Sequence, residues 1–166
     1  MGGRVILYAM DSEARVLIDF MDSVFYGPGW HGPELYPTLQ LLSVEQALEP
    51  AGPDGYSTWQ LVLHCAYWKH VILKRLSVTD AAFERSPADF PALPEGKDSA
   101  AWERDLQLLV EKHEALKTGV RRLGNEELGQ TSTDEKFSKE SLVLSIAAHD
   151  AYHTGHIRNM GIEGLK

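Results

Sequence analysis

The chain has 166 residues, enough for one domain with a hydrophobic core, and its 43% hydrophobic and 24% charged residues are typical of a globular protein. The formal net charge of −8 argues against nucleic acid and anionic membranes as partners, because an acidic surface repels phosphate groups. The single cysteine, Cys65, excludes an internal disulfide and suits a reducing compartment, so we expect a cytoplasmic protein.

No segment of the sequence has the features of a membrane span or of an export signal. Its apolar stretches fall well short of the ~18 consecutive apolar residues that a membrane-spanning helix needs. Near the N-terminus the apolar run Val5–Met10 covers only six residues, and acidic residues follow it, unlike a signal peptide. We therefore expect residues 1–166 to form a single domain without a membrane helix.

The first predicted helix covers residues 12–25 and is followed by a long connection. Apolar side chains at three- and four-residue spacing mark its buried face, namely Val16, Leu17, Phe20, Met21 and Val24. The run Gly27-Pro28-Gly29 ends this helix. Within the connection, residues 30–57, we expect two short helical pieces, the second opened by a capping box of Ser43 and Gln46.

The next two predicted helices cover residues 57–78 and 98–123. A second capping box, Ser57 with Gln60, opens the first of them. Its buried face carries, in helical register, Leu61, His64, Cys65, Trp68, Ile72 and Leu76. The proline-rich residues 79–97 predict an irregular loop. The buried face of the later helix, which ends at Gly124-Asn125, carries Trp102, Leu106, Leu109, Val110, Leu116 and Val120.

The last predicted helix covers residues 138–160, after a polar segment, 125–136, that we expect to be a loop. Its buried face is formed by Leu142, Ser145, Ile146, His149, His153, His156, Ile157 and Met160. No segment shows sustained period-two alternation, so no sheet is expected. Four long amphipathic helices predict an all-α four-helix bundle, and the long connection after the first helix allows a crossover to a non-adjacent helix.

Three histidines on the predicted buried faces form a candidate metal site. His149 and His153 are four residues apart, which places both side chains on one helix face, roughly 6 Å apart along the axis. His64 lies on the buried face of another helix. Three imidazoles with a position left for water are typical of catalytic metal sites, and imidazole suits zinc, nickel, iron, cobalt or copper better than calcium or magnesium. The alternative is that each imidazole is a hydrogen-bonded core residue.

Three sequence runs, taken together, resemble the DinB-like superfamily of small four-helix-bundle proteins. These runs are Trp30-His31-Gly32-Pro33, Ser57-Thr58-Trp59-Gln60-Leu61-Val62-Leu63-His64, and His149-Asp150-Ala151-Tyr152-His153-Thr154-Gly155. The superfamily is related to bacterial thiol-dependent transferases and to mycothiol-dependent maleylpyruvate isomerase. The resemblance implies that His64, His149 and His153 bind a nickel- or zinc-like ion. It also implies a low-molecular-weight thiol as cosubstrate and a homodimer.

One position departs from the pattern of these relatives. They commonly carry Gln after the Gly of the closing run, where this chain has His156. His156 lies seven residues beyond His149, roughly 10 Å along the helix, so ligation together with the other histidines would be strained. We expect His156 to form hydrogen bonds on the pocket wall; the alternatives are a fourth ligand, or an acid or base acting near pH 7.

Other chemically capable residues are expected to be mainly structural. Cys65 points about 100° away from His64 and is predicted to be a buried, inert thiol rather than a nucleophile. Asp150 is either a partner of a ligand imidazole or a solvated surface residue. His31 either belongs to the pocket rim or caps the chain after the first helix. Surface positions are predicted for His70 and His113, and core positions for Trp59, Trp68 and Trp102.

Three functions fit the candidate site. A low-pKa thiol bound to the metal can attack a small electrophile in a transferase or isomerase reaction. Metal-activated water would instead make the protein a hydrolase. A non-catalytic metal-binding or stress-related bundle would use the same histidines only for structure. We favour the thiol-dependent enzyme acting on a small molecule.

Overall fold

The computed structural model describes residues 12–50, 55–133 and 136–165, and these ranges contain helices but no strand. The helices are α1 Ser12–Phe25, α2 Leu35–Gln40, α3 Val44–Leu48, α4 Thr58–Arg75, α5 Ser99–Arg122, α6 Asn125–Leu128 and α7 Lys139–Arg158. The predicted all-α class is confirmed. The apolar run at residues 5–10 and the breakers at residues 52 and 53 lie outside the described ranges. In the described ranges, no helix is both long enough and apolar enough to cross a membrane.

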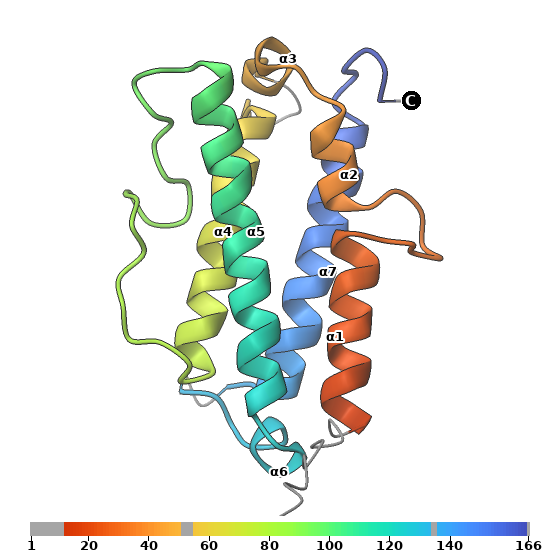
Figure 1. Ribbon diagram of the computed structural model, residues 1–166, viewed down its shortest axis with the longest axis vertical. Helices are drawn as coiled ribbons and strands as arrows, with labels where there is room; N and C mark the ends of the chain where they lie inside the picture. The colour runs from red at the N-terminus through yellow and green to blue at the C-terminus, as the bar shows by residue number, and fades with distance from the viewer. Residues whose placement is uncertain (1–11, 51–54, 134–135, 166) are drawn as a thin grey trace, which may run out of the picture.

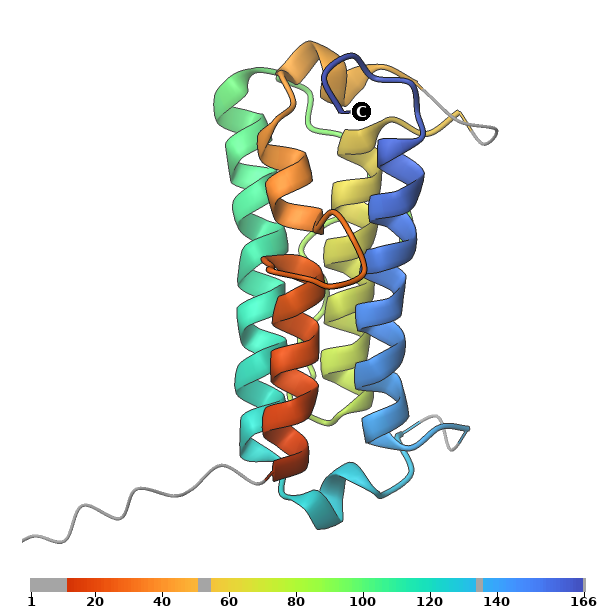
Figure 2. The same ribbon diagram turned by 90° about the vertical axis from the view of Figure 1, so that its right-hand side faces the viewer.

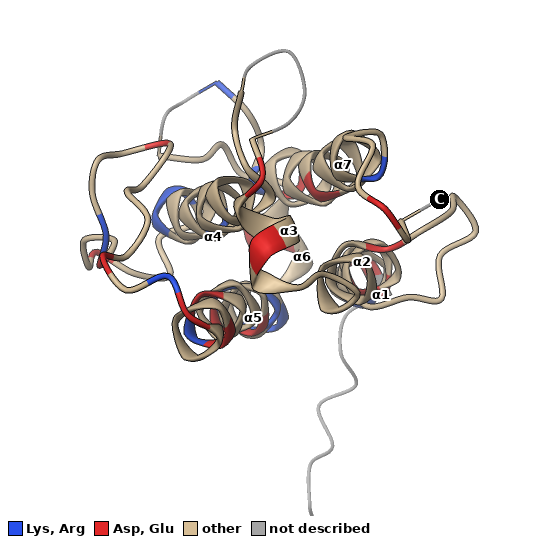
Figure 3. Cartoon of the chain, turned by 90° about the horizontal axis from the view of Figure 1, so that it is seen from above, with Lys and Arg blue, Asp and Glu red and all other residues tan. Residues whose placement is uncertain are grey.

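Four long helices form the bundle, and their order around it shows the predicted crossover. Helix α1 packs against α5 and α7, and α4 packs against the same two helices. Helices α1 and α4, which follow one another along the chain apart from the short α2 and α3, therefore occupy diagonal corners (Figure 3). The long connection after α1 thus carries the chain across one end of the bundle.

The short elements cover the two ends of the bundle and one of its sides. Helices α2 and α3 lie at the upper end, and α6 lies at the lower end (Figures 1 and 2). Residues 79–97, predicted as a loop, contain no helix or strand, and they return along the outside of α4 and α5 from the lower end to the upper end (Figure 1). This loop brings side chains to α4 that no neighbouring helix supplies.

Capping side chains set where the long helices begin. The Ser57 hydroxyl accepts a hydrogen bond from the Gln60 backbone N–H, and the Gln60 side chain accepts one from the Ser57 backbone N–H. This is the predicted capping box at the start of α4, and Ser43 forms the corresponding one at α3. Asp98 and Ser138 cap α5 and α7 in the same way, through a single side-chain bond each. These caps satisfy backbone donors that would otherwise lack partners.

Most residues predicted on the inward faces of the helices are buried, and the largest departure is on α1. Leu17, Met21 and Val24 are buried as expected, but Val16 is 61% exposed and Phe20 is 39% exposed. The predicted buried face was too wide, because α5 and α7 cover only the inner side of α1 and leave its flank exposed to solvent. Trp59 and Trp102 are buried and pack edge to face, with ring centroids 5.2 Å apart. The apolar core therefore spans the bundle, whereas one flank of α1 and the exposed Ser145 of α7 depart from the predicted pattern.

His113 is fully buried, so its predicted surface position is wrong. It stacks on Phe25 of α1 with ring centroids 3.9 Å apart, and its Nε2 lies 3.0 Å from Asp22 Oδ1. The sequence did carry the signal, because His113 lies four residues after Leu109 and three before Leu116, on the buried stripe of α5. The pKa of His113 is lowered to about 2, mainly because the ring is buried. The positive charges of Lys69 and Lys117 contribute smaller parts of this shift.

The loop 79–97 changes the surroundings of two further residues on α4. His70 is 4% exposed rather than on the surface, and its ring Nε2 lies 3.0 Å from the Ala81 carbonyl oxygen. Trp68, predicted to be in the core, is only half-buried, and its indole N–H donates to Asp89 Oδ1 at 2.7 Å. Both differences have one cause, since a loop of irregular sequence, and not a helix, covers this side of α4.

The segment 125–136 was predicted to be a loop, but it begins with the short helix α6. Leu128 at the end of α6 is buried against the lower part of the core, which anchors the turn. An isolated turn of this length gains little from its own hydrogen bonds, so this tertiary contact stabilises it.

A buried ion pair links α4 to α7 in the interior of the bundle. Lys69 and Asp150 are each 1% exposed and form a hydrogen-bonded pair, and Lys69 Nζ also lies 5.0 Å from the centroid of the Phe25 ring. Of the two alternatives for Asp150, the surface position is wrong, and the hydrogen-bond partner of its carboxylate is Lys69 rather than an imidazole. Helix α7 packs against α1, α2 and α4, which buries a wider face than the predicted stripe.

We predict that Asp150→Ala will lower the free energy of unfolding of the metal-free protein by about 3–5 kcal/mol, because Lys69 would stay buried without a counter-ion. The double variant Lys69→Met/Asp150→Leu should recover most of this loss, since it removes both charges. Urea denaturation followed by circular dichroism in the presence of a chelator measures both effects. A loss below about 1 kcal/mol for Asp150→Ala would contradict a strongly coupled pair.

Candidate metal centre

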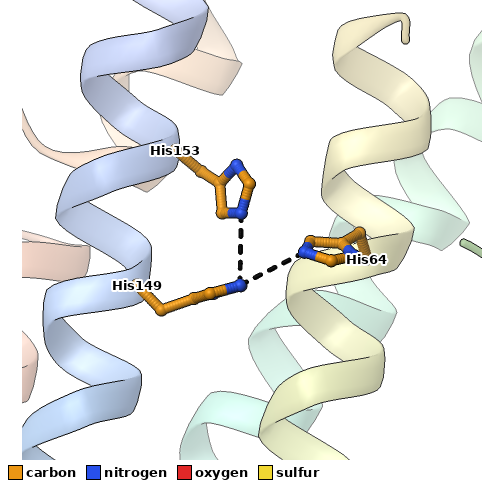
Figure 4. A group of neighbouring side chains, drawn as sticks. All are labelled: His64, His149 and His153. Carbon is orange, nitrogen blue, oxygen red and sulfur yellow. Dashed lines mark hydrogen bonds between the residues drawn. The ribbon is translucent and has the colours of Figure 1, made fainter. Parts of the chain in front are cut away.

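Three imidazole rings meet at the interface between α4 and α7. His64 comes from α4, and His149 and His153 come from successive turns of α7 (Figure 4). The Nε2 atom of His149 lies 3.2 Å from Nε2 of His64 and 3.1 Å from Nε2 of His153. His64 and His153 are 7% and 6% exposed, and His149 is half-buried. The predicted histidines are thus brought together, with one nitrogen of each turned toward a common point.

The hydrogen atoms on these neutral rings cannot form hydrogen bonds at both of the close contacts that His149 Nε2 makes with His64 and His153. The two oxygens that face His64 Nδ1 are acceptors, so Nδ1 carries the hydrogen of the neutral ring and Nε2 presents a lone pair. His149 Nε2 takes part in both contacts and holds at most one hydrogen. Only one of the two contacts can therefore be a hydrogen bond. A cation at the meeting point would accept a lone pair from all three rings.

The spacing of the nitrogens also fits a metal ion. Imidazole nitrogens lie about 2.0–2.1 Å from zinc, so two ligand nitrogens are about 2.8–3.4 Å apart for bond angles between 90° and tetrahedral. The observed separations of 3.1 and 3.2 Å fall in this interval. The candidate donor atoms of all three histidines lie within 4.8 Å of one another. The three residues can therefore hold a divalent ion of the kind that prefers nitrogen ligands.

Burial keeps the three rings in the neutral form that a metal requires. Desolvation is the main cause that lowers the pKa of each ring, and the neighbouring histidines add to it for the two residues of α7. The pKa is about 4 for His149 and about 3 for His153. For His64 the pKa is also lowered, although its hydrogen bond to Asp89 partly opposes the shift. In the folded chain, protons therefore compete weakly for the nitrogens of His149 and His153 above about pH 5.

The sequence did not reveal the residues that surround His64. Its Nδ1–H donates to the backbone carbonyl of Asp89 at 2.9 Å, and Phe90 stacks on the ring with centroids 4.2 Å apart. Both residues belong to the loop 79–97, where no periodicity indicates which side chain reaches the bundle. Lys69, in contrast, lies four residues after Cys65 and three before Ile72, so its buried position could have been read from the helical register.

A groove of about 300 Å³ opens beside the histidines, between α4 and α7. One end is formed by His149, and the walls are mainly apolar. The other lining residues are Trp68, Ile72, Arg75, Phe137, Leu142, Ser145 and Ile146. The volume lies at the lower end of the range of small-molecule sites. The candidate centre thus has a neighbouring space that can hold the apolar part of a small ligand.

Three other predicted residues lie near or outside the centre. His156 stacks beside His153 with ring centroids 6.4 Å apart, but it is outside the group of three, and in the described structure its buried Nε2 has no hydrogen-bond partner. Its role stays a prediction. Cys65 is buried as expected, and burial raises the pKa of its thiol. His31 is exposed in the connection between α1 and α2, packed closely on Gly29.

We predict that the metal-free protein loses stability as the pH falls from about 6.5 toward 4. The folded state keeps His149 and His153 neutral in this interval, whereas the unfolded chain binds protons at the ordinary histidine pKa. These two rings therefore do not lower the free energy of unfolding above about pH 6.5. On acidification below that pH the free energy of unfolding falls, by at most about 1.4 kcal/mol per pH unit for each proton.

Urea denaturation at a series of pH values, with chelator, measures this dependence. The double variant His149→Gln/His153→Gln is the control, since it retains every other titrating group and should show a shallower slope between pH 6.5 and 4. Equal slopes for the two proteins would show that these rings do not keep their low pKa values in solution.

The all-helical fold agrees with the comparison to known protein families. The sequence model of the DinB superfamily matches residues 30–157, a range that includes α4, α5, α7 up to its penultimate residue, and the three histidines of the centre. Comparisons with curated proteins and with solved structures give no match. Because the family match covers most of the sequence, the chain belongs to the DinB superfamily.

Proposed function

We propose that this protein is a metal-dependent enzyme that uses a low-molecular-weight thiol to modify or isomerise a small electrophile. The observation that carries the proposal is the convergence of three Nε2 atoms from two helices, with separations that fit a zinc-like ion. Three protein ligands leave coordination positions for exchangeable groups, as in catalytic metal sites. Membership of the DinB superfamily supports the same reading.

Each residue of the site would have a separate role in the proposed reaction. His64, His149 and His153 would hold the ion, which when bound would lower the pKa of a thiol and so favour the nucleophilic thiolate. The low pKa values of the two α7 histidines leave one nitrogen of each ring unprotonated at neutral pH. The buried thiol of Cys65 does not compete as a nucleophile, because burial raises its pKa.

The apolar groove beside His149 supports a small electrophile with an apolar body. Trp68 and Phe137 contribute aromatic surface, and Phe137 is 51% exposed, so its ring is accessible to a ligand. Burial of apolar surface in such a groove contributes about 25 cal/mol per Å² to binding before the costs of association. A ligand seated there would have one end at His149, next to the candidate metal position.

We predict that protein purified without a His-tag holds about one nickel or zinc ion per chain. His64→Ala, His149→Ala and His153→Ala should each lower the metal content severalfold, because two imidazoles bind far more weakly than three. Elemental analysis after dialysis measures the content. His156→Gln is the matched control on the same helix and should keep the ion. Metal loss in His156→Gln equal to that in His149→Ala would contradict a centre of three histidines.

The metal-loaded protein should then convert small electrophiles only when a thiol is present. Turnover is measured with several thiols against a panel of electrophiles, and the His149→Ala variant should lose it. Turnover that continues without any thiol would favour a hydrolase instead. Full metal loading with no turnover under either condition, and a His149→Ala variant that loses only stability, would favour a non-catalytic metal-binding bundle.

We also predict that Ser145→Trp blocks the groove without disturbing the metal. Ser145 is exposed and lines the groove, so a large ring there would fill it. Binding of the fluorescent apolar probe 1-anilinonaphthalene-8-sulfonate to metal-loaded protein should weaken at least tenfold, with unchanged metal content. Ala148→Trp is the control, because Ala148 is exposed on the same helix but does not line the groove. Equal probe binding by both variants would exclude the groove as the apolar site.

A further inference from the structure

The loop 79–97 is fixed to the bundle at several points on either side of the candidate metal centre. Glu84 accepts a hydrogen bond from Lys112 of α5 at 2.7 Å, and Arg85 pairs with the buried carboxylate of Asp105. Farther along, Phe90 stacks on Tyr56 with ring centroids 3.9 Å apart. These contacts hold the intervening residues against α4, on the side where His64 lies.

Asp89, between these anchors, faces His64 with two oxygen atoms. Its backbone carbonyl accepts from His64 Nδ1 at 2.9 Å, and its carboxylate Oδ1 lies 3.1 Å from the same nitrogen. The indole N–H of Trp68, one turn further along α4, donates to this Oδ1 at 2.7 Å. The carboxylate therefore bridges two side chains of one helix, and one of them is a member of the candidate centre.

The backbone of Asp89 has an unusual conformation that makes this double contact possible. Its φ angle is +69°, in the left-handed region that costs a residue other than glycine about 1 kcal/mol or more, although Asp tolerates it better than most. A strained backbone persists only when its surroundings impose it, and such positions cluster at functional sites. Here the turn directs the carbonyl and the carboxylate of one residue to one imidazole nitrogen.

The double contact decides which nitrogen of His64 carries the hydrogen. Two acceptors at Nδ1 require Nδ1–H, which leaves Nε2 unprotonated and directed at His149 Nε2, 3.2 Å away. The other two rings differ, because in the described structure Nδ1 of His149 and Nδ1 of His153 are buried without a hydrogen-bond partner. Of the three rings, His64 is the one whose tautomer and orientation are set by an outer residue.

We propose that the Asp89 carboxylate is a positioning residue of the centre, which fixes His64 as the Nδ1–H tautomer and directs its Nε2 toward the common point. Residues that hydrogen-bond to metal-ligating imidazoles commonly raise metal affinity by ten- to a hundredfold. The part of this inference that concerns metal affinity rests on the proposed function. The part that concerns the tautomer stands without any metal.

The tautomer is tested by nitrogen-15 NMR of the His64 ring in the metal-free protein. Asp89→Gly removes the carboxylate, keeps the backbone carbonyl as one acceptor and adopts the positive φ without strain, so the fraction of the Nε2–H form should rise above that of the wild type. Asp89→Asn retains an oxygen acceptor and tolerates the same backbone, so it should restore the wild-type spectrum. Glu84→Gln is the control, because it removes the charge from a different anchor of the same loop and should leave the tautomer unchanged. A wild-type tautomer in Asp89→Gly would overturn the proposal.

Metal affinity is measured on the same proteins by cobalt(II) titration against a competing chelator, with the visible absorption bands of the ion as a second readout. Asp89→Gly should weaken binding by ten- to a hundredfold and shift these bands, whereas Glu84→Gln should stay within twofold of wild type. Equal weakening in both variants would show that Asp89 merely anchors the loop. If the wild type binds no cobalt but Asp89→Gly still changes the tautomer, the proposed function fails and the positioning role stands.

Discussion

The meeting of three imidazole nitrogens between α4 and α7 is the constraint on which the rest of this structure depends. Two of the rings come from one helix and the third from another, so α4 and α7 must lie side by side at a fixed height. Burial lowers the pKa of all three rings and keeps them neutral, and neutral rings cannot satisfy both of their close contacts with hydrogens. The arrangement is compatible with a bound cation, which would accept a lone pair from each ring and so remove the need for a hydrogen at either contact.

The polar groups around this centre lie in an interior that is otherwise apolar. The Lys69–Asp150 pair crosses between the same two helices, and Asp105 accepts from the Trp59 indole N–H while it pairs with Arg85 of the loop. Buried charges are costly unless they are paired, so these contacts specify which helices face one another more than they add stability. Fold and function remain separate conclusions here, because one bundle can carry many reactions.

Local sequence patterns determined most of the helical architecture. The Ser57–Gln60 capping box sets the start of α4, and the spacing of apolar residues predicted the approximate bounds of the long helices. The four-residue spacing of His149 and His153 placed both on one face, since that geometry is internal to a single helix. The apolar spacing of α4 placed His64 on a buried face as well, and the resemblance to a family indicated the same three histidines. Such features depend on neighbours within a few residues, so they can be read without knowledge of the fold.

Contacts between distant segments decided the rest. Asp89 reaches His64 only because an irregular loop folds back along α4, and a loop without periodicity does not indicate which side chain points inward. The pairing of Lys69 with Asp150 likewise follows from the way α4 and α7 face one another, although the helical register alone already indicated that His113 and Lys69 are buried. The sequence by itself therefore determined the helices and the one-helix part of the site. Only the tertiary structure decided its surroundings, because burial and hydrogen bonding there depend on residues far apart in the chain.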